Sequence, residues 1–298
     1  MGVFFEVVLP IISIFVIGFV VQKWRKLDVK TASTLTIYVF IPFLVFQAFY
    51  DKEFSGDFSM IVMFCFILLF SIILLDKILA KILKWDRGEE SGIILSTAFM
   101  NAGNYGAPVV LFALGQEAFT YAVIFFSIQA IIMNIFGVYY ASRGGYEIRY
   151  AFYSVLKMPA TYAIILAFSL NGLNVQLGGP VIEMIDFMAA VGLPLMMVVL
   201  GMQLANIEFK EFEISKVAIG SAIKLLAMPL VAWLFVWLLP VSPLIGKVII
   251  ILSAMPTAAT TTMFALEFKA RPDLVSSVTM VTTLLSVVTN SVLLAILV

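Results

Sequence analysis

The stretch STAFMNAGNYGAP, from Ser96 to Pro108, places two asparagines, two glycines and a proline in a segment that is otherwise apolar enough for a bilayer. Non-helical backbone is tolerated in hydrocarbon only where protein or trapped water satisfies its N–H and C=O groups. We therefore expect Asn101–Pro108 to be an unwound segment that joins two half-helices and avoids lipid. Gly103 and Gly106 permit backbone angles that other residues resist, and Pro108 suits the first turn of a new helix.

The composition of the whole chain indicates an all-α polytopic membrane protein. Of its 298 residues, 63% are hydrophobic and 12% are charged, which is too little charge for the surface of a soluble domain of this length. The net charge is zero and no basic block is present, so we expect no nucleic-acid partner. The chain has no histidine and a single cysteine, Cys65, which argues against a metal site, a cofactor or an internal disulfide.

Ten segments are long and apolar enough to cross a bilayer as helices, which takes roughly 20 residues each. They cover residues 3–22, 31–50, 58–78, 91–114, 117–141, 150–170, 180–205, 212–239, 244–267 and 272–297. Basic side chains gather beside the connections that follow odd-numbered segments: Lys23, Arg25, Lys26, Lys30, Lys77, Lys81, Lys84, Arg87, Arg143, Arg149, Lys210, Lys216, Lys269 and Arg271, against Lys52 and Lys247 on the other side. The positive-inside rule then predicts that these connections are cytoplasmic and that both termini lie outside.

Landmark residues of the first half recur in the second half about 150 positions later. The pairs are Pro10 with Pro159, Pro42 with Pro194, Leu95–Ala98 with Leu252–Met255, and Asn134 with Asn290. This order predicts two five-helix repeats, residues 1–145 and 146–298. Because five is odd, the second repeat would cross the membrane in the opposite sense, a construction typical of secondary transporters. Ten helices without a repeat remain the alternative.

A second broken helix is predicted in the ninth segment, which contains SAMPTAATTTMFALEF from Ser253 to Phe268. Pro256 breaks this helix, and hydroxyls follow at Thr257, Thr260, Thr261 and Thr262. If the fourth and ninth segments cross at their breaks, two half-helix N-termini meet and attract an anion. Aligning Ser96 with Ser253 leaves the two prolines nine positions out of register, so the breaks need not be symmetry mates.

Other polar residues of the apolar segments have two possible roles: to line a cavity, or to form hydrogen bonds between helices. For Asn134 and Asn290 we favour side chains that line a cavity. For the Ser and Thr residues of the fifth and tenth segments we favour hydrogen bonds between helices. Gln129 and Gln203 leave both readings open.

Lys224 is the most costly residue, because it lies about ten residues into the eighth segment. It would serve coupling or charge compensation, or else extend its ammonium to the cytoplasmic interface. Glu183 and Asp186, at the outer start of the seventh segment, are an entry or proton-exchange pair or plain interfacial charges.

Two signatures resemble the auxin efflux carrier family. NAGNYGAPV, from Asn101 to Val109, is similar to the first, and MPTAATTTMFALEFKARPDL, from Met255 to Leu274, is similar to the second. The polar last segment with Asn290 and the missing central loop of bacterial members also fit, so the resemblance covers nearly the whole chain. Glu267 and Lys269 depart from the pattern at the cytoplasmic mouth.

The resemblance implies ten helices as two inverted five-helix repeats with crossing broken helices 4 and 9, as in plant auxin carriers and bile-acid/sodium symporters. It implies a scaffold of segments 1, 2, 6 and 7 and a transport domain of segments 3–5 and 8–10 that move as an elevator. It also implies efflux or exchange of small organic carboxylates, a homodimer, and a bacterial inner membrane. The expected substrate-binding residues are Asn101, Gly103, Asn104, Pro108, Asn134, Pro256, Thr257, Thr260, Thr261 and Asn290, with Lys224 as a possible coupling residue.

Three other classes compete with a carboxylate carrier. A sodium-coupled anion symporter of the bile-acid type would place acidic residues next to the breaks, whereas these breaks are rich in Asn and Thr. An intramembrane enzyme is disfavoured, because the sequence has no metal-ligand cluster, no His–Glu motif and no mid-membrane aspartate pair. A channel or receptor would need no inverted repeat within one chain.

Overall fold

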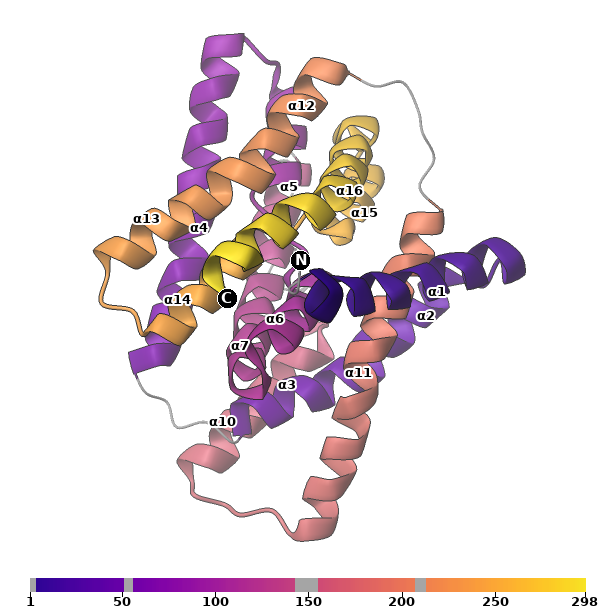
Figure 1. Cartoon of the computed structure of the whole chain (residues 1–298), viewed down its shortest axis with the longest axis vertical. Coiled ribbons are helices and arrows are strands. Elements are labelled where there is room, and N and C mark those ends of the chain that lie inside the picture. The colour runs from indigo at the N-terminus through magenta and orange to yellow at the C-terminus, as the bar shows by residue number, and fades with distance from the viewer. Residues whose placement is uncertain (1–3, 51–55, 143–154, 207–212) are drawn as a thin grey trace.

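The computed structural model describes residues 4–50, 56–142, 155–206 and 213–298, and within these ranges the regular elements are helices, without a β-strand. Seven of them are long and apolar enough to cross a membrane: Glu6–Arg25, Val29–Tyr50, Gly56–Leu83, Gln116–Ala141, Gly179–Ala205, Ile214–Leu238 and Pro272–Leu297. They coincide with seven of the ten predicted segments. The fold is therefore that of a multi-pass, all-helical membrane protein (Figure 1).

The helices of the first half follow the predicted order. Segments one to three are η1 (Phe4–Val8) with α1 (Leu9–Arg25), then α2 (Val29–Leu35), η2 (Thr36–Phe40) and α3 (Ile41–Tyr50), then α4 (Gly56–Leu83). Segments four and five are α5 (Arg87–Thr97), η3 (Ala102–Gly106) and α6 (Ala107–Leu114), then α7 (Gln116–Ile132), η4 (Met133–Gly137) and α8 (Val138–Ala141). The η elements are π-helical turns.

The helices of the second half also follow the order predicted from the sequence. Segments six to eight are α10 (Pro159–Gly172), α11 (Gly179–Ala205), and α12 (Ile214–Ala222) with η5 (Ile223–Ala227) and α13 (Met228–Leu238). Segments nine and ten are α14 (Pro243–Ser253) with α15 (Ala259–Glu267), and α16 (Pro272–Leu297). Segments four and nine are each divided into shorter helices, by a first break at residues 98–101 and a second break at residues 254–258. The predicted start of segment six, residues 150–154, lies outside the described residues.

Local chemistry explains where several helices begin. The Asp86 side chain accepts hydrogen bonds from the first turn of α5 while Glu89 reaches back to the Asp86 N–H, which is a complete capping box. Ser242 caps α14 through its hydroxyl, and proline stands in the first turn of α10, α11, α14 and α16, where its missing N–H has no intrahelical partner to lose. The two half-helices that lead into the breaks, α5 and α14, therefore both start with a capping side chain.

Close helix contacts hold together a small group of helices made of α1, α2, η2, α3, α10 and α11. A Cβ atom on Gly201 of α11 would lie 2.0 Å from the carbonyl oxygen of Phe15, and one on Gly18 of α1 would lie 2.1 Å from that of Val198. Glycine permits this approach of two backbones, as is common between membrane helices. α3 packs against α10 and α11, which joins these helices to α1 and α2 in one group. This small group occupies the lower and right part of Figure 1.

The remaining helices form a large group, α4 to α8 with α12 to α16, in the upper and left part of Figure 1. Within it α4 packs on α5 and α7, α12 packs on α16, and α13 packs on α14. The two groups meet where α3 contacts α7 and where α11 contacts η3. The first break therefore lies at the contact between the groups.

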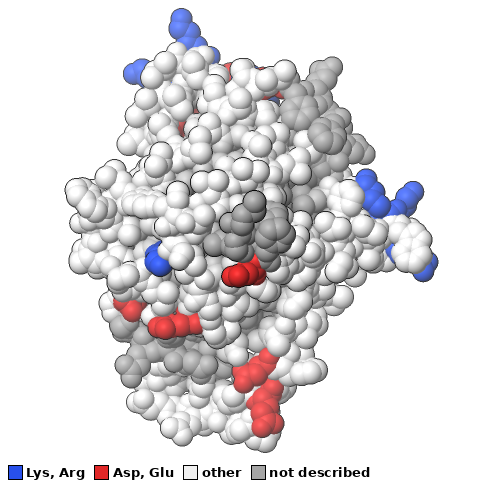
Figure 2. Space-filling model, in the orientation of Figure 1, with Lys and Arg blue, Asp and Glu red and all other residues white. Residues whose placement is uncertain are grey.

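Lys and Arg are unevenly distributed over the face shown in Figure 2. They gather at the upper end of α4 and the outer tip of α1, with one more at the left, while most of the visible Asp and Glu lie on the lower half and a few lie near the top. The basic ends are those that the positive-inside rule assigns to the cytoplasm. The orientation in the membrane stays a prediction.

Candidate functional site

The two breaks pair with each other through their backbones. The N–H of Asn101 donates to the carbonyl of Pro256 at 2.8 Å, and the N–H of Ala258 donates to the carbonyl of Phe99 at 3.1 Å. Each break thus supplies partners for backbone groups that have no helical partner in the other. This pairing satisfies the requirement that non-helical backbone at membrane depth be satisfied within the protein.

The pairing is symmetric in the numbering of the two halves. Met100 and Thr257 form an antiparallel backbone bridge, and they are separated by 157 positions, the same offset as Ser96 and Ser253. The nine-position mismatch between the prolines disappears, because Pro108 is not at the first break. Residues at equivalent positions of the two halves therefore face each other at the crossing.

The first break is shorter than predicted and lies earlier in the chain. Asn101–Pro108 was expected to be unwound, but residues 102–106 form the π-helical turn η3 and Pro108 stands in the first turn of α6. The N–H of Gly106 donates to the carbonyl of Asn101 at 3.0 Å, so helical hydrogen bonding resumes at once after the break. The wide turn lies just before Pro108, which has no N–H to continue the pattern.

The two glycines of the signature serve close packing rather than unusual backbone angles, since neither has a positive φ. A Cβ atom on Gly106 would lie 2.6 Å from Cδ2 of Leu252 on α14, and one on Gly103 would lie 3.1 Å from Cε of Met196 on α11. These positions let η3 contact both the other half-helix and the small group.

Threonine hydroxyls form hydrogen bonds that hold the two breaks together at the crossing. The Thr257 hydroxyl donates to the carbonyl of Ser96 at 2.5 Å, and the Thr257 N–H donates to the hydroxyl of Thr282 at 3.3 Å. The Thr261 hydroxyl donates to the carbonyl of Ala258 at 2.8 Å. Thr257, Thr261 and Thr282 are fully buried, so these bonds hold the breaks together without contacting solvent.

Two cavities flank the crossing, of 430 and 540 Å³. Residues common to both linings are Ile37, Tyr38, Asn101, Asn104 and Thr260. Asn101 and Asn104 belong to the start of one half-helix and Thr260 to the start of the other. Both cavities also contain side chains from the small and the large group, so they lie along the contact between the groups.

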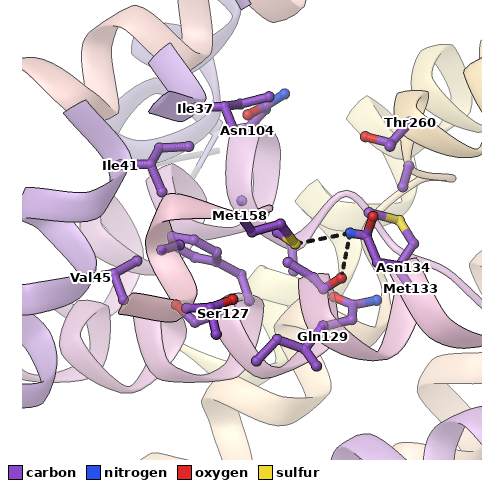
Figure 3. A pocket seen from close by; sticks show the side chains of 18 of the residues that line it. Ile37, Ile41, Val45, Asn104, Ser127, Gln129, Met133, Asn134, Met158 and Thr260 are labelled. Carbon is purple, nitrogen blue, oxygen red and sulfur yellow. Dashed lines mark hydrogen bonds between the residues drawn. The ribbon is translucent and has the colours of Figure 1, made fainter. Parts of the chain in front are cut away.

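The first cavity is shown from close by in Figure 3, where Asn104 and Thr260 border it from one side and Gln129 and Asn134 from the other. The Asn134 amide donates to the carbonyl of Ala130 at 2.8 Å and contacts the sulfur of Met158 at 3.2 Å. The Gln129 amide nitrogen is buried without a partner among the described residues. Gln129 is therefore a donor still available to a ligand.

The second cavity lies between α2, α11, α15 and α16 and is lined by hydroxyls and amides. The Thr262 and Thr279 hydroxyls are 3.2 Å apart, and the Gln203 amide contacts the Ser33 hydroxyl at 3.4 Å. Each cavity has one lysine among its lining residues, Lys157 in the first and Lys30 in the second. Neither lining includes an aspartate or a glutamate among the described residues.

Six of the predicted site residues line the cavities: Asn101, Gly103, Asn104, Asn134, Thr257 and Thr260. Pro108, Pro256, Thr261, Asn290 and Lys224 do not line them in this conformation. Asn290 is buried beside Tyr105, and its amide nitrogen is 3.8 Å from the sulfur of Met255. Lys224 and Asn290 instead contact residues at or next to the breaks, Thr97 and Met255, from the protein interior.

Lys224 does not extend to the interface. Its side chain is fully buried, and its ammonium donates to the carbonyl of Thr97 at 3.3 Å, at the end of α5 just before the first break. The Thr97 hydroxyl lies 2.6 Å from a carboxylate oxygen of Asp76, which is also fully buried. Asp76 is absent from the sequence-based predictions. The signal that would have found it is an acidic residue within the apolar segment 58–78.

The fold and this site define a class: a multi-pass membrane protein with polar, helix-terminal groups at a crossing inside the molecule. The family model described as membrane transport protein matches residues 3–150 and residues 147–294, so the chain belongs to this family of transporters, the auxin efflux carrier family. It is also 27% identical over 290 residues, 95% of each chain, to an uncharacterized transporter of Methanothermobacter thermautotrophicus. Family and relative are transporters and not enzymes.

Proposed function

We propose that this transporter carries small organic carboxylates across the membrane by an elevator movement of the large group against the small group. The observation that carries the proposal is the set shared by both cavities, Asn101, Asn104 and Thr260, at the start of two half-helices. Both cavities include residues from helix ends that the predicted topology places in the cytoplasm, such as Lys157 in the first and Lys30 in the second, so the shared group would be reached from that side here. Alternating access requires a second conformation in which the same group is open to the other side.

The electrostatics of the crossing favour an anion. The first N–H groups of a helix generally lack intrahelical partners, and each helix start, here those of η3 and α15, carries a partial positive charge. The amide and hydroxyl side chains of Asn104 and Thr260 add donors at the same place. With one lysine and no carboxylate in either described lining, the cavities attract negative charge and repel none.

The arrangement of the helices supports the movement. The same family model matches each half of the chain, and equivalent residues of the two halves meet at the bridge between Met100 and Thr257. Both observations support two inverted repeats, which provide two related conformations of similar energy. Because the cavities lie between the groups, sliding the large group would expose the shared residues first on one side and then on the other.

Three further features belong to the proposal. The gathering of Lys and Arg at the ends of α1 and α4 in Figure 2 supports a cytoplasmic position of these ends and both termini outside. A bacterial inner membrane and a homodimer stay predictions from the family resemblance. Glu183 and Asp186 remain candidates for an entry pair, and Asp186 accepts a hydrogen bond of 2.6 Å from the Gln47 amide.

The experiment compares acids with their own amides in proteoliposomes. Uptake is measured first for a panel of monocarboxylates and dicarboxylates, and then in competition with the matching amides at a pH where the acids are ionised. An amide keeps the shape but loses the charge, and its NH₂ group faces donors. Each unmatched buried donor costs on the order of 1–3 kcal/mol, so the amide should compete at least about tenfold more weakly. Equal competition would remove the carboxylate assignment.

A further inference from the structure

Asp76 and Lys224 form a charged pair inside the large group, away from both cavities. Asp76 lies on α4 and Lys224 on η5, and neither side chain has any exposed surface. The pair interacts electrostatically but is not in direct ion-pair contact among the described residues. A charged side chain inside a membrane segment is costly in free energy, so its presence there indicates a functional role.

Thr97 joins the two charged groups to the first break. Its hydroxyl bonds Asp76 at 2.6 Å and its carbonyl accepts from Lys224 at 3.3 Å. Thr97 is the last residue of α5, where carbonyls lack helical partners and the helix dipole is negative. The ammonium of Lys224 therefore caps the half-helix that leads into the crossing.

The second carboxylate oxygen of Asp76 has no hydrogen-bond partner in the part of the chain that the structure describes. An ionised carboxylate in this position is incompletely neutralised, because its cation lies beyond Thr97 rather than against it. The other charged group that acts on it is Glu90, from α5, which carries the same sign of charge. Glu117 of α7 lies near the opposite end of α4 from Asp76. Tyr121, one helical turn from Glu117, donates a hydrogen bond to Asp57 at that end.

We propose that Asp76 is a proton-binding site, coupled through Thr97 and Lys224 to anion binding at the crossing, so that one proton moves with each carboxylate. This step rests on the proposed carboxylate transport. With Asp76 ionised the pair has no net charge. When the Asp76 carboxylate takes up a proton from water, the pair keeps the single positive charge of the Lys224 ammonium. This positive charge balances the charge of an anion bound beside the first break. When the anion leaves, the proton returns to water.

The closed surroundings of Asp76 fit this role. Since the carboxyl group is fully buried in this conformation, it exchanges its proton only after the large group or its neighbours rearrange. Proton release would then occur in a conformation different from the one described here. Such occlusion is what prevents a coupled carrier from leaking protons between transport steps.

The first test needs no substrate. Infrared difference spectra of the purified full-length protein, recorded over a pH titration, should show a buried carboxylic acid C=O band that is absent from Asp76→Asn. The matched control is Asp57→Asn, the same substitution at the other end of α4, which should keep the band. A band of equal size in Asp76→Asn would overturn the assignment.

The second test uses succinate, which is ionised at neutral pH and crosses lipid poorly, in proteoliposomes with a pH gradient and the membrane potential held at zero, and protein-free liposomes give the passive background. Under these conditions one pH unit drives about tenfold accumulation of an anion that moves with one proton. Asp76→Asn should lose this accumulation but still exchange internal for external substrate at equal pH, whereas Asp57→Asn should behave as wild type. Accumulation that persists in Asp76→Asn would contradict the proposal.

Two further outcomes separate the possibilities. If Asp76→Asn does not fold, Asp76→Glu replaces it, and its pH profile of transport should shift because the longer carboxyl group changes its distance to Thr97 and Lys224. An unshifted profile counts against the proposal. If no carboxylate is transported, the proposed function fails, while the infrared titration still decides whether Asp76 binds a proton.

Discussion

Thr260 and Asn104 combine the properties expected of substrate contacts, because they are polar, only half-buried and shared by both cavities. Thr257 and Thr261 have the same chemistry but are fully buried, and their hydroxyls bond backbone carbonyls. A hydroxyl already engaged in the protein is a poor partner for a ligand. Among the threonines at and after the second break, Thr260 is shared by both cavities, whereas the hydroxyls of Thr257 and Thr261 hold the crossing. Thr257 and Thr262 line the second cavity only.

Replacing Thr260 by valine should lower transport kcat/KM on the order of tenfold or more without unfolding the protein. A hydrogen bond to a charged group contributes about 1.5–3 kcal/mol, and 1.4 kcal/mol is a factor of ten. The control is Thr120→Val on α7, whose hydroxyl bonds its own helix at Gln116. Equal transport by both variants in proteoliposomes would place Thr260 outside the binding site.

Replacing Lys224 by methionine should lower the thermal stability of the purified protein. Breaking a buried charge pair from one side costs on the order of 3–5 kcal/mol, because the other charge stays buried and uncompensated. The double variant Lys224→Met with Asp76→Asn removes both charges and should recover part of the lost Tm. If the double variant is no more stable than the single one, the two side chains are not energetically coupled.

The contact between α1 and α11 and the crossing of the two broken helices are built in different ways. α1 and α11 approach through glycine, which leaves their helical hydrogen bonds intact. The broken helices approach through unwound backbone, which frees N–H and C=O groups and then pairs them across the crossing. The first contact suits a fixed support, and the second creates polar helix ends inside the membrane.

Replacing Gly201 by alanine should destabilise the contact between α1 and α11 by about 1–3 kcal/mol, the usual cost of overpacking. The new Cβ atom would meet the carbonyl of Phe15 at 2.0 Å, and backbone cannot swing aside as a side chain can. Gly179→Ala lies on the same helix with nothing within 4 Å and serves as the control. The measurement is Tm in detergent, and equal values for the two variants would contradict this packing.

The molecule as a whole is two groups of helices with cavities of mixed apolar and polar lining between them, and Lys and Arg gather at the ends of α1 and α4. Because each group combines helices from both halves of the chain, neither half is an independent unit. Relative movement of the groups would change access to the shared residues while the crossing itself stays intact. That arrangement is the physical content of the proposed elevator.

Cysteine labelling tests the predicted orientation. With Cys65, which is buried, replaced by alanine, single cysteines at Lys26 and Lys84 should react from the cytoplasmic side of the membrane. A cysteine at the exposed Leu173, between α10 and α11, should react from the outside. Lys26 and Lys84 on opposite sides would contradict the topology, whatever the substrate is.

Much of this architecture could be predicted without coordinates, because the cost of polar backbone in hydrocarbon acts on each segment separately. Apolar runs marked the membrane helices. The Asn-, Gly- and Pro-containing stretch in segment four and the proline followed by threonines in segment nine marked the two helices that break. The positions of Asn101, Asn104 and Thr260 at cavities followed from the same reasoning. These conclusions need only neighbouring residues and a known solvent.

The remaining features depend on contacts between residues far apart in the chain. The break ends at Asn101 rather than Pro108 because Pro256 supplies the partner for its N–H, and Gly106 is needed for Leu252 rather than for its own backbone angles. Lys224 is held inside the protein by Thr97 and Asp76, from two other helices. The sequence shows how polar each residue is. Only packing in three dimensions decides which distant group forms a hydrogen bond with it.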